Sequence, residues 1–293
     1  MLERAGDDPV EIVIVRTGGD ERPAGAASPA PVGDKSRFVK EIEEALLAGD
    51  ADLAVHSAKD VPGELPAGLA LAGVPERADA RDALCGAASL DSLPAGARVG
   101  TSSLRRRAQL LAARPDLDVA ELRGNVDTRL RKLAEEDYDA VVLAAAGLAR
   151  LGRPEAGEPL AAALMTPAPG QGCLALETRA DDERATDLAL SLTHRESLVC
   201  LTAERALVHR LDASCRTPVA AHAELGGGRL RLAAFAGLPD GSTWIRDELE
   251  GDAAEPSALG AAVAERLLAA GAAEVLAQAE LTGMNAPPPG GAE

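Results

Sequence analysis

Short aliphatic runs alternate with longer amphipathic stretches along the first half of the chain. Strands are predicted where Val, Ile and Leu cluster, at residues 10–15, 52–56, 118–122 and 139–144, with a further strand ending at 99–100. Helices are predicted where apolar residues recur every three or four positions, at residues 38–48, 103–113 and 126–136. Strands and helices that alternate in this way are typical of α/β folds.

Polar residues at the helix starts indicate caps. Thr101 or Ser102 is expected to cap the helix at 103–113, and Asn125 the helix at 126–136. The several prolines of residues 154–169 predict a linker.

The pattern changes from Ser197 onward. A long helix is followed by hairpin-like strands at 229–236 and 243–250 and by an Ala-rich helix at 258–270. This order predicts a separate α+β domain. The Pro/Gly-rich residues 286–293 predict a disordered tail.

The overall composition excludes several classes of protein. Hydrophobic residues make up 46% of the chain, which excludes an acidic disordered protein. The net charge of −17 and the aromatic content of 1% argue against nucleic-acid binding through phosphate contacts or base stacking. The chain has no apolar run long enough to span a bilayer and no secretory signal, so a cytoplasmic protein without membrane contact is expected.

Four cysteines are present, and none forms a CxxC pair or has a histidine at zinc-ligand spacing. No metal site is therefore expected, and sparse cysteines fit a reducing compartment. Cys85, Cys173 and Cys200 are interpreted as inert buried thiols. Cys215 lies in a turn-like segment, where a thiol is a candidate attachment point or nucleophile.

A basic island interrupts this acidic chain. Between residues 98 and 133, nine basic residues face four acidic ones, which gives a local charge of +5. The polar motifs follow predicted strands, so they are expected at one type of sheet edge, around one cleft. The arginines expected to converge there are Arg105, Arg106, Arg123, Arg129 and Arg150. Such a cluster indicates recognition of a polyanion, whereas Arg107, Arg114 and Arg131 are expected on solvated helix faces.

Two further motifs are ambiguous on their own. In HSAKDVP (residues 56–62), Asp60 beside Lys59 could be a surface ion pair or a catalytic acid, and His56 is interpreted as structural. The stretch GQGCLA (residues 170–175) matches a dinucleotide-binding pattern, but prolines precede it instead of a clear strand. A hinge or chain crossing between domains is the favoured interpretation of that stretch.

Six segments in order resemble the porphobilinogen deaminase (hydroxymethylbilane synthase) family. They include HSAKDVP, GTSSLRRR, LRGNVDTR, PGQG and DASCRTPV, and lie at residues 38–62, 99–117, 122–133, 143–152, 169–172 and 202–219. The resemblance implies an α/β protein with two periplasmic-binding-protein-like lobes and a small α+β C-terminal domain. Domain 1 would comprise residues 1–75 and 170–192, domain 2 residues 76–167, and domain 3 residues 195–285.

The resemblance also implies an activity. The family is monomeric and cytoplasmic, needs no metal, and carries one covalent dipyrromethane cofactor, here joined to Cys215 by a thioether. It condenses four porphobilinogen units head-to-tail on this primer and releases hydroxymethylbilane by hydrolysis, a step of tetrapyrrole synthesis. Two classes of alternative remain: a non-catalytic periplasmic-type module that binds a polycarboxylate, and an inactive truncated form.

The family's site residues transfer to matching positions of this chain. Asp60 matches the catalytic aspartate. The implied cofactor contacts are Cys215, Lys59, Ser57, Thr101, Ser103, Arg105, Arg106 and Gln171. The implied substrate contacts are Phe38, Arg123, Asn125, Arg129 and Arg150.

One departure from the family pattern concerns the start of the chain. The family opens with a strand followed by an R-x-S-x-L-A segment, which this sequence lacks. Residues 10–15 resemble the family's second strand. We therefore expect that the natural protein begins upstream of Met1.

Overall fold

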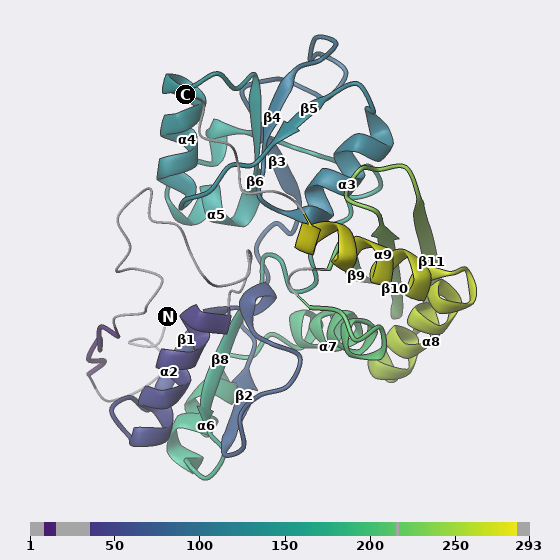
Figure 1. Cartoon of the computed structure of the whole chain (residues 1–293). Coiled ribbons are helices and arrows are strands. Elements are labelled where there is room, and N and C mark those ends of the chain that lie inside the picture. Colours follow the sequence, from purple (N-terminus) through teal and green to yellow (C-terminus); the bar gives the residue numbers. More distant parts are fainter. Residues whose placement is uncertain (1–8, 16–35, 215–216, 286–293) are drawn as a thin grey trace.

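The part of the chain that the structure describes contains three β-sheets, each associated with helices, in a mixed α/β fold (Figure 1). The computed structural model describes residues 9–15, 36–214 and 217–285. The predicted α/β class is confirmed.

The largest sheet has five strands in the order β5-β4-β6-β3-β7. The strands are β3 (Asp82–Cys85), β4 (Arg98–Gly100), β5 (Asp118–Ala120), β6 (Ala140–Ala144) and β7 (Glu158–Pro159). Strand β4 pairs in parallel with β5 and β6, whereas β3 runs antiparallel to β6 and β7. The carboxyl ends of three parallel strands therefore lie at one sheet edge, as predicted, and the motifs that follow them share that edge.

Helices α3 (Leu104–Ala113), α4 (Val126–Glu135) and α5 (Ala145–Arg150) cover this sheet. Alternation along the strands produces two apolar faces. One cluster joins Leu84, Val99 and Val142 to Leu110 of α3. The opposite cluster joins the intervening strand residues to apolar side chains of α4 and α5. Each fully buried Leu or Val stabilises the fold by about 1.5–3 kcal/mol.

The helix caps differ in one case from the prediction. Asn125 caps α4, because its side chain accepts a hydrogen bond from the backbone N–H of Thr128. The cap of α3 is Ser103, so Thr101 and Ser102 were the wrong candidates. Thr101 Oγ1 accepts instead from the N–H of Ser103 at 3.2 Å, one step ahead of the helix.

The second sheet has three antiparallel strands in the order β1-β8-β2. They are β1 (Leu53–Ser57), β2 (Leu69–Gly73) and β8 (Leu174–Arg179), with helices α2 (Ser36–Ala48) and α6 (Glu183–Ser191) packed against them. The helix predicted at 38–48 is confirmed, and its Val39 and Leu46 are buried. A short 3-10 turn, η1 (Ala58–Asp60), follows β1 and carries the end of the HSAKDVP motif.

The strand predicted at residues 10–15 is wrong. This segment has no regular secondary structure, and Ile12 and Ile14 are 84% and 85% exposed. An aliphatic alternation becomes a strand only where a partner supplies ladder hydrogen bonds and a face to bury. None of the described strands pairs with this segment.

The third sheet has the order β11-β10-β9 and forms the C-terminal part of the fold. Its strands are β9 (Val219–Gly226), β10 (Arg229–Gly237) and β11 (Trp244–Asp252), and its helices are α7 (Arg195–Arg210), α8 (Pro256–Ala269) and α9 (Ala272–Asn285). The predicted hairpin, long helix and Ala-rich helix are confirmed. Strand β9 and helix α9 were not predicted.

The chain passes between the first two sheets twice, near residues 74–81 and 166–172. At the second crossing, Gly172 has φ +87°, and a Cβ there would lie 2.4 Å from the carbonyl oxygen of Ala78. Only glycine allows the two crossings to approach so closely. The chain-crossing interpretation of GQGCLA is confirmed. The linker predicted at 154–169 is only partly confirmed, because η2 (Pro154–Ala156) and β7 lie within it.

Candidate active site

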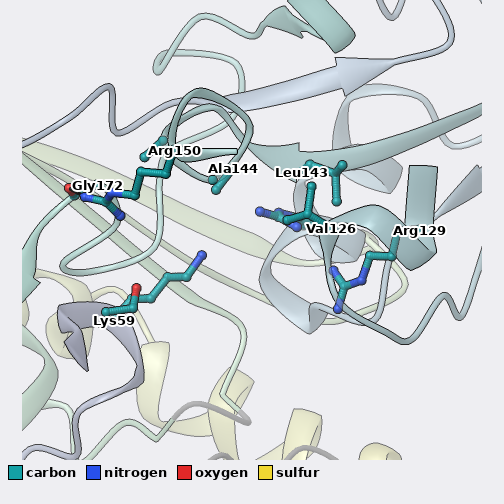
Figure 2. A pocket seen from close by; sticks show the side chains of 11 residues that line it. Lys59, Val126, Arg129, Leu143, Ala144, Arg150 and Gly172 are labelled. Carbon is teal, nitrogen blue, oxygen red and sulfur yellow. Dashed lines mark hydrogen bonds between the residues drawn. The ribbon is translucent and has the colours of Figure 1, made fainter. Parts of the chain in front are cut away.

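A pocket of about 140 Å³ lies where the five-stranded sheet faces η1 and the second crossing (Figure 2). It is lined by Ser57, Lys59, Arg106, Val126, Arg129, Leu143, Ala144, Ala146, Gly147, Arg150 and Gly172. Four of these side chains are cationic, and none of these lining residues is acidic. The pocket is therefore suited to a ligand with several negative charges.

The cations come from opposite sides of the pocket. Figure 2 shows Lys59 rising from η1 on one side, while Arg129 of α4 and Arg150 of α5 come from the other. The convergence predicted from the sequence is thus confirmed for Arg106, Arg129 and Arg150.

Arg129 has an unfavourable electrostatic position in the pocket. Burial and the neighbouring Arg106 lower the pKa of its guanidinium to about 10. An arginine stays protonated at physiological pH. The lowered pKa therefore indicates a charge whose cost an anionic ligand would offset.

Backbone carbonyls hold two of these guanidinium groups. Arg129 Nε donates to Gly124 O at 2.8 Å, and its Nη2 lies 3.4 Å from Ser102 Oγ. Arg150 Nη2 donates to Gly172 O at 2.8 Å, across from α5 to the second crossing. These neutral acceptors orient the guanidinium groups without cancelling their charge.

Arg105 does not line the pocket, which corrects the predicted five-arginine cleft. Its Nη1 donates to Asp82 Oδ2 at 2.7 Å and to Thr166 O at 2.7 Å. Arg106 also pairs with Asp82, through Nε at 2.9 Å, but still lines the pocket. Arg105 is held away from the pocket because the carboxylate of Asp82 is fully buried and needs nearby cations.

Arg123 and Asn125 also lie apart from the pocket lining. Arg123 is exposed, and its Nε donates to Glu121 Oε1 at 2.7 Å. Asn125 is exposed and acts as the cap of α4. Thr101 and Ser103 serve the turn before α3. The predicted cleft therefore contains three of the five arginines.

The HSAKDVP motif supplies the other wall. Ser57 ends β1 and Lys59 and Asp60 lie on η1, all three partly buried. Lys59 Nζ lies 3.4 Å from Gln171 Oε1 of the second crossing. His56 is buried, with Nε2 2.8 Å from Glu177 Oε2, so its structural interpretation is confirmed.

The cysteines divide as predicted where the structure describes them. Cys85, Cys173 and Cys200 are buried free thiols, and burial raises their pKa values to about 11, 12 and 11. Such thiols are poor nucleophiles. Cys215 lies outside the described residues, as does the side chain of Phe38.

Sequence reasoning missed Asp82, which organises the arginine side of the site. Its only signal is an acid at the head of the apolar run DALC. A carboxylate that begins a buried strand requires compensation, and arginines were available nearby in the sequence. Gln171 was predicted as a cofactor contact, but here it bonds Asp82, Ala80 and Lys59.

Over residues 9–15, 36–214 and 217–285, no helix has the length and apolar character needed to cross a membrane. The same residues contain no group of three or more His, Cys, Asp or Glu side chains suited to a metal ion.

Two sequence profiles of one family match the chain. The profile described as porphobilinogen deaminase, dipyromethane cofactor binding domain, matches residues 1–187. The profile described as porphobilinogen deaminase, C-terminal domain, matches residues 198–269.

Curated relatives agree with the profiles. The porphobilinogen deaminase of Geobacter metallireducens is 48% identical over 271 residues, covering 92% of this chain and 85% of the relative. That of Syntrophotalea carbinolica is 50% identical, covering 86% and 81%. That of Nitratidesulfovibrio vulgaris is 48% identical, covering 96% and 90%. This chain belongs to the porphobilinogen deaminase family.

The donor set fits the dipyrromethane cofactor of that family. A dipyrromethane made from two porphobilinogen units carries acetate and propionate arms, which are carboxylates at neutral pH. The lining residues provide three guanidinium groups, one ammonium and one hydroxyl, and no carboxylate that would repel those arms.

Proposed function

We propose that this chain condenses four porphobilinogen units head-to-tail on a covalent dipyrromethane primer and releases hydroxymethylbilane by hydrolysis. The observation that carries the proposal is the pocket in which Lys59, Arg106, Arg129 and Arg150 converge without an acidic lining residue. Membership of the porphobilinogen deaminase family supports the same reaction.

The cofactor would be held by one covalent bond and by contacts to its carboxylate arms. Cys215 would form the thioether, while Arg106, Lys59 and Ser57 would bind the carboxylate arms. When bound, the dipyrromethane supplies the free pyrrole position at which chain extension starts. Arg105, Thr101, Ser103 and Gln171 would support the cofactor indirectly, since each is engaged in the bonds described above.

Asp60 would be the catalytic residue. Porphobilinogen loses ammonia to give an electron-poor pyrrole whose positive charge extends to the ring nitrogen. A carboxylate facing the pyrrole N–H stabilises that cation and accepts or returns its proton. Asp60 follows Lys59 on η1, the turn that carries Lys59 to the pocket, but it is not itself one of the lining residues.

The substrate contacts would be Arg129 and Arg150 at the pocket, together with Arg123, Asn125 and Phe38. Asn125 is the N-cap of α4, the helix that carries Arg129, and Arg123 comes two residues before this cap. An exposed arginine there could receive later rings of a growing chain that gains two carboxylates per unit.

The larger organisation is also proposed. The three sheets would correspond to domain 1 (residues 1–75 and 170–192), domain 2 (76–167) and domain 3 (195–285), in a cytoplasmic monomer without nucleic-acid partners. Domains 1 and 2 would resemble the lobes of periplasmic binding proteins.

Intact mass spectrometry and a bilane-synthesis assay test the proposal together. The purified chain should carry an adduct of two pyrrole units that is absent from the Cys215→Ser variant, and it should convert porphobilinogen to hydroxymethylbilane. A protein of unmodified mass that binds porphobilinogen without releasing ammonia would instead support a polycarboxylate-binding module.

A further inference from the structure

A buried carboxylate organises the arginine wall of the pocket. Asp82, fully buried at the start of β3, accepts hydrogen bonds from Arg105 Nη1 and Nη2 at 2.7 and 3.1 Å. It also accepts from Arg106 Nε at 2.9 Å and from Gln171 Nε2 at 3.0 Å. Burial alone raises the pKa of Asp82, but Arg105 and Arg106 outweigh it and hold that pKa well below its usual range. Asp82 is therefore a permanent anion.

The two arginines that share Asp82 are used differently. Arg105 is buried between Asp82 and Thr166 O. Arg106 donates from Nη1 to Val142 O at 2.8 Å and from Nε to Asp82, which fixes the plane of its guanidinium at the pocket wall. With one carboxylate between two guanidinium groups, the cluster keeps a net positive charge, and Arg106 is the member that faces the pocket.

Gln171 connects this cluster to the opposite wall. Its Nε2 donates to Asp82 Oδ1 and, at 2.7 Å, to Ala80 O, which fixes the amide orientation. Its Oε1 then faces Lys59 Nζ at 3.4 Å. A continuous series of hydrogen bonds therefore runs from Arg106 through Asp82 and Gln171 to Lys59. It joins strand β3 and helix α3 of one sheet to η1 of the other.

We infer that Asp82 is a positioning residue that, through Gln171, sets the separation between the cations of Arg106 and Lys59. The inference rests on the proposed function. A ligand whose carboxylate arms contact both walls needs these two charges at a fixed separation. Asp82 and Gln171 are not among the residues that line the pocket. Their effect on the reaction would therefore be transmitted through Arg106 and Lys59.

The Gln171→Met variant tests the path without disturbing charge. Methionine has similar length and removes all three hydrogen bonds of the Gln171 amide, while the ion pairs of Asp82 with Arg105 and Arg106 stay intact. We expect the KM for porphobilinogen to rise about tenfold, the loss produced by one displaced charge-assisted contact, with kcat nearly unchanged. The enzyme is assayed as the full-length holoenzyme.

A second readout follows Lys59 directly. The chain contains four lysines, so ¹³C labelling at lysine Cε gives few NMR signals, and the Lys59→Arg variant assigns one of them. Gln171→Met should shift the Lys59 signal and leave that of Lys132, which pairs with Glu136 on α4, unchanged. A merely structural glutamine would not move one lysine selectively.

Asp82→Asn tests the anion, with Asp79→Asn as the matched control. Asp79 lies three residues earlier and pairs with Arg81 at an exposed position. Asp82→Asn should lower kcat/KM by about 100-fold, a larger loss than that of a single hydrogen bond, and shift the Lys59 signal. Asp79→Asn should do neither. If Asp82→Asn fails to fold, Gln171→Met decides alone.

A Gln171→Met enzyme with wild-type KM and an unshifted Lys59 signal overturns the inference. If the wild-type chain itself makes no bilane, the proposed function fails. The NMR comparison then still shows whether the path from Asp82 to Lys59 exists.

Discussion

Arg77 and Glu204 form a buried ion pair, with Arg77 Nη1 2.7 Å from Glu204 Oε1. Arg77 belongs to the first crossing, between the five-stranded sheet and the β1-β8-β2 sheet, and Glu204 belongs to helix α7 of the C-terminal part. The same carboxylate accepts from the backbone N–H of Gly170 at 2.6 Å and of Ala223 at 2.8 Å. One side chain thus ties both crossings and strand β9 to α7.

Removal of this carboxylate should destabilise the whole chain. Glu204→Ala leaves the Arg77 guanidinium mostly buried without its ion-pair partner, and breaking a buried pair in this way costs about 3–5 kcal/mol. Urea unfolding followed by circular dichroism measures the loss. Glu265→Ala is the control, because its pair with Arg210 is exposed, and such pairs contribute about 0–1 kcal/mol. Equal losses in the two variants would contradict the role given to Glu204.

The stabilisation by Glu204 should depend on pH in one direction. Burial raises its pKa, but Arg77 and His222 outweigh burial and hold the pKa below its usual value. A depressed carboxyl pKa stabilises the folded state above the unfolded pKa of about 4.3, and this contribution is lost as pH falls through the lower folded pKa. The stability difference between wild type and Glu204→Gln should therefore be constant from pH 7 to about 5 and shrink below that. Urea unfolding as a function of pH tests this, and a gap that persists in acid would refute it.

The sequence predicted those parts of the fold that depend on local pattern. Three features were predicted in this way: the strands before α3 and α4, the Asn125 cap, and the β10–β11 hairpin. In each, a regular spacing of apolar residues ends at a polar residue or a glycine. Residues 10–15 carried the same strand signal and failed, because a strand also needs a partner, which local pattern does not encode.

The site residues could be predicted where they directly follow strands along the chain. Arg106, Arg129 and Arg150 follow strands that end at one sheet edge, so their convergence could be inferred. Arg105 could not be separated from Arg106 by sequence, because the choice depends on Asp82, which approaches α3 only after β3 has entered the sheet. Long-range electrostatic pairing of this kind leaves no periodic signal.

Arg129 should matter more for ligand binding than for stability. Arg129→Leu removes a pocket cation whose pKa is already lowered by burial and by Arg106. The loss of a charged hydrogen bond of about 1.5–3 kcal/mol predicts a KM increase of about 10- to 150-fold. The melting temperature should stay unchanged or rise, since a repulsive charge is gone. Arg131→Leu, on the exposed face of the same helix, is the control and should leave KM unchanged. A similar KM for both variants would argue against Arg129 as a ligand contact.

Thiol labelling should report on Cys215 alone. Burial raises the pKa values of Cys85, Cys173 and Cys200 to about 11, 12 and 11, so thiolate is scarce in these residues at pH 8. Native protein with the cofactor attached should take up no iodoacetamide within minutes, and protein freed of cofactor should take up one label, lost in Cys215→Ser. Peptide mass spectrometry locates the label. Rapid labelling of a buried cysteine in native protein would show that the packing around it opens.

Asp60→Asn should separate catalysis from folding and cofactor attachment. The substitution keeps the size of the side chain but removes the negative charge that would stabilise the cationic pyrrole and exchange its proton. General acid–base and electrostatic contributions of this kind predict a fall in kcat of about 10²- to 10⁴-fold, with an unchanged melting temperature. Asp52→Asn, an exposed partner of Arg179 in the same part of the fold, is the matched control and should keep wild-type kcat. Intact mass of the Asp60→Asn protein distinguishes the two possible failures, because a protein that carries the two-pyrrole adduct yet releases no ammonia is blocked in turnover. Wild-type kcat in Asp60→Asn would remove Asp60 from the catalytic role and direct the search to Lys59 on the same turn.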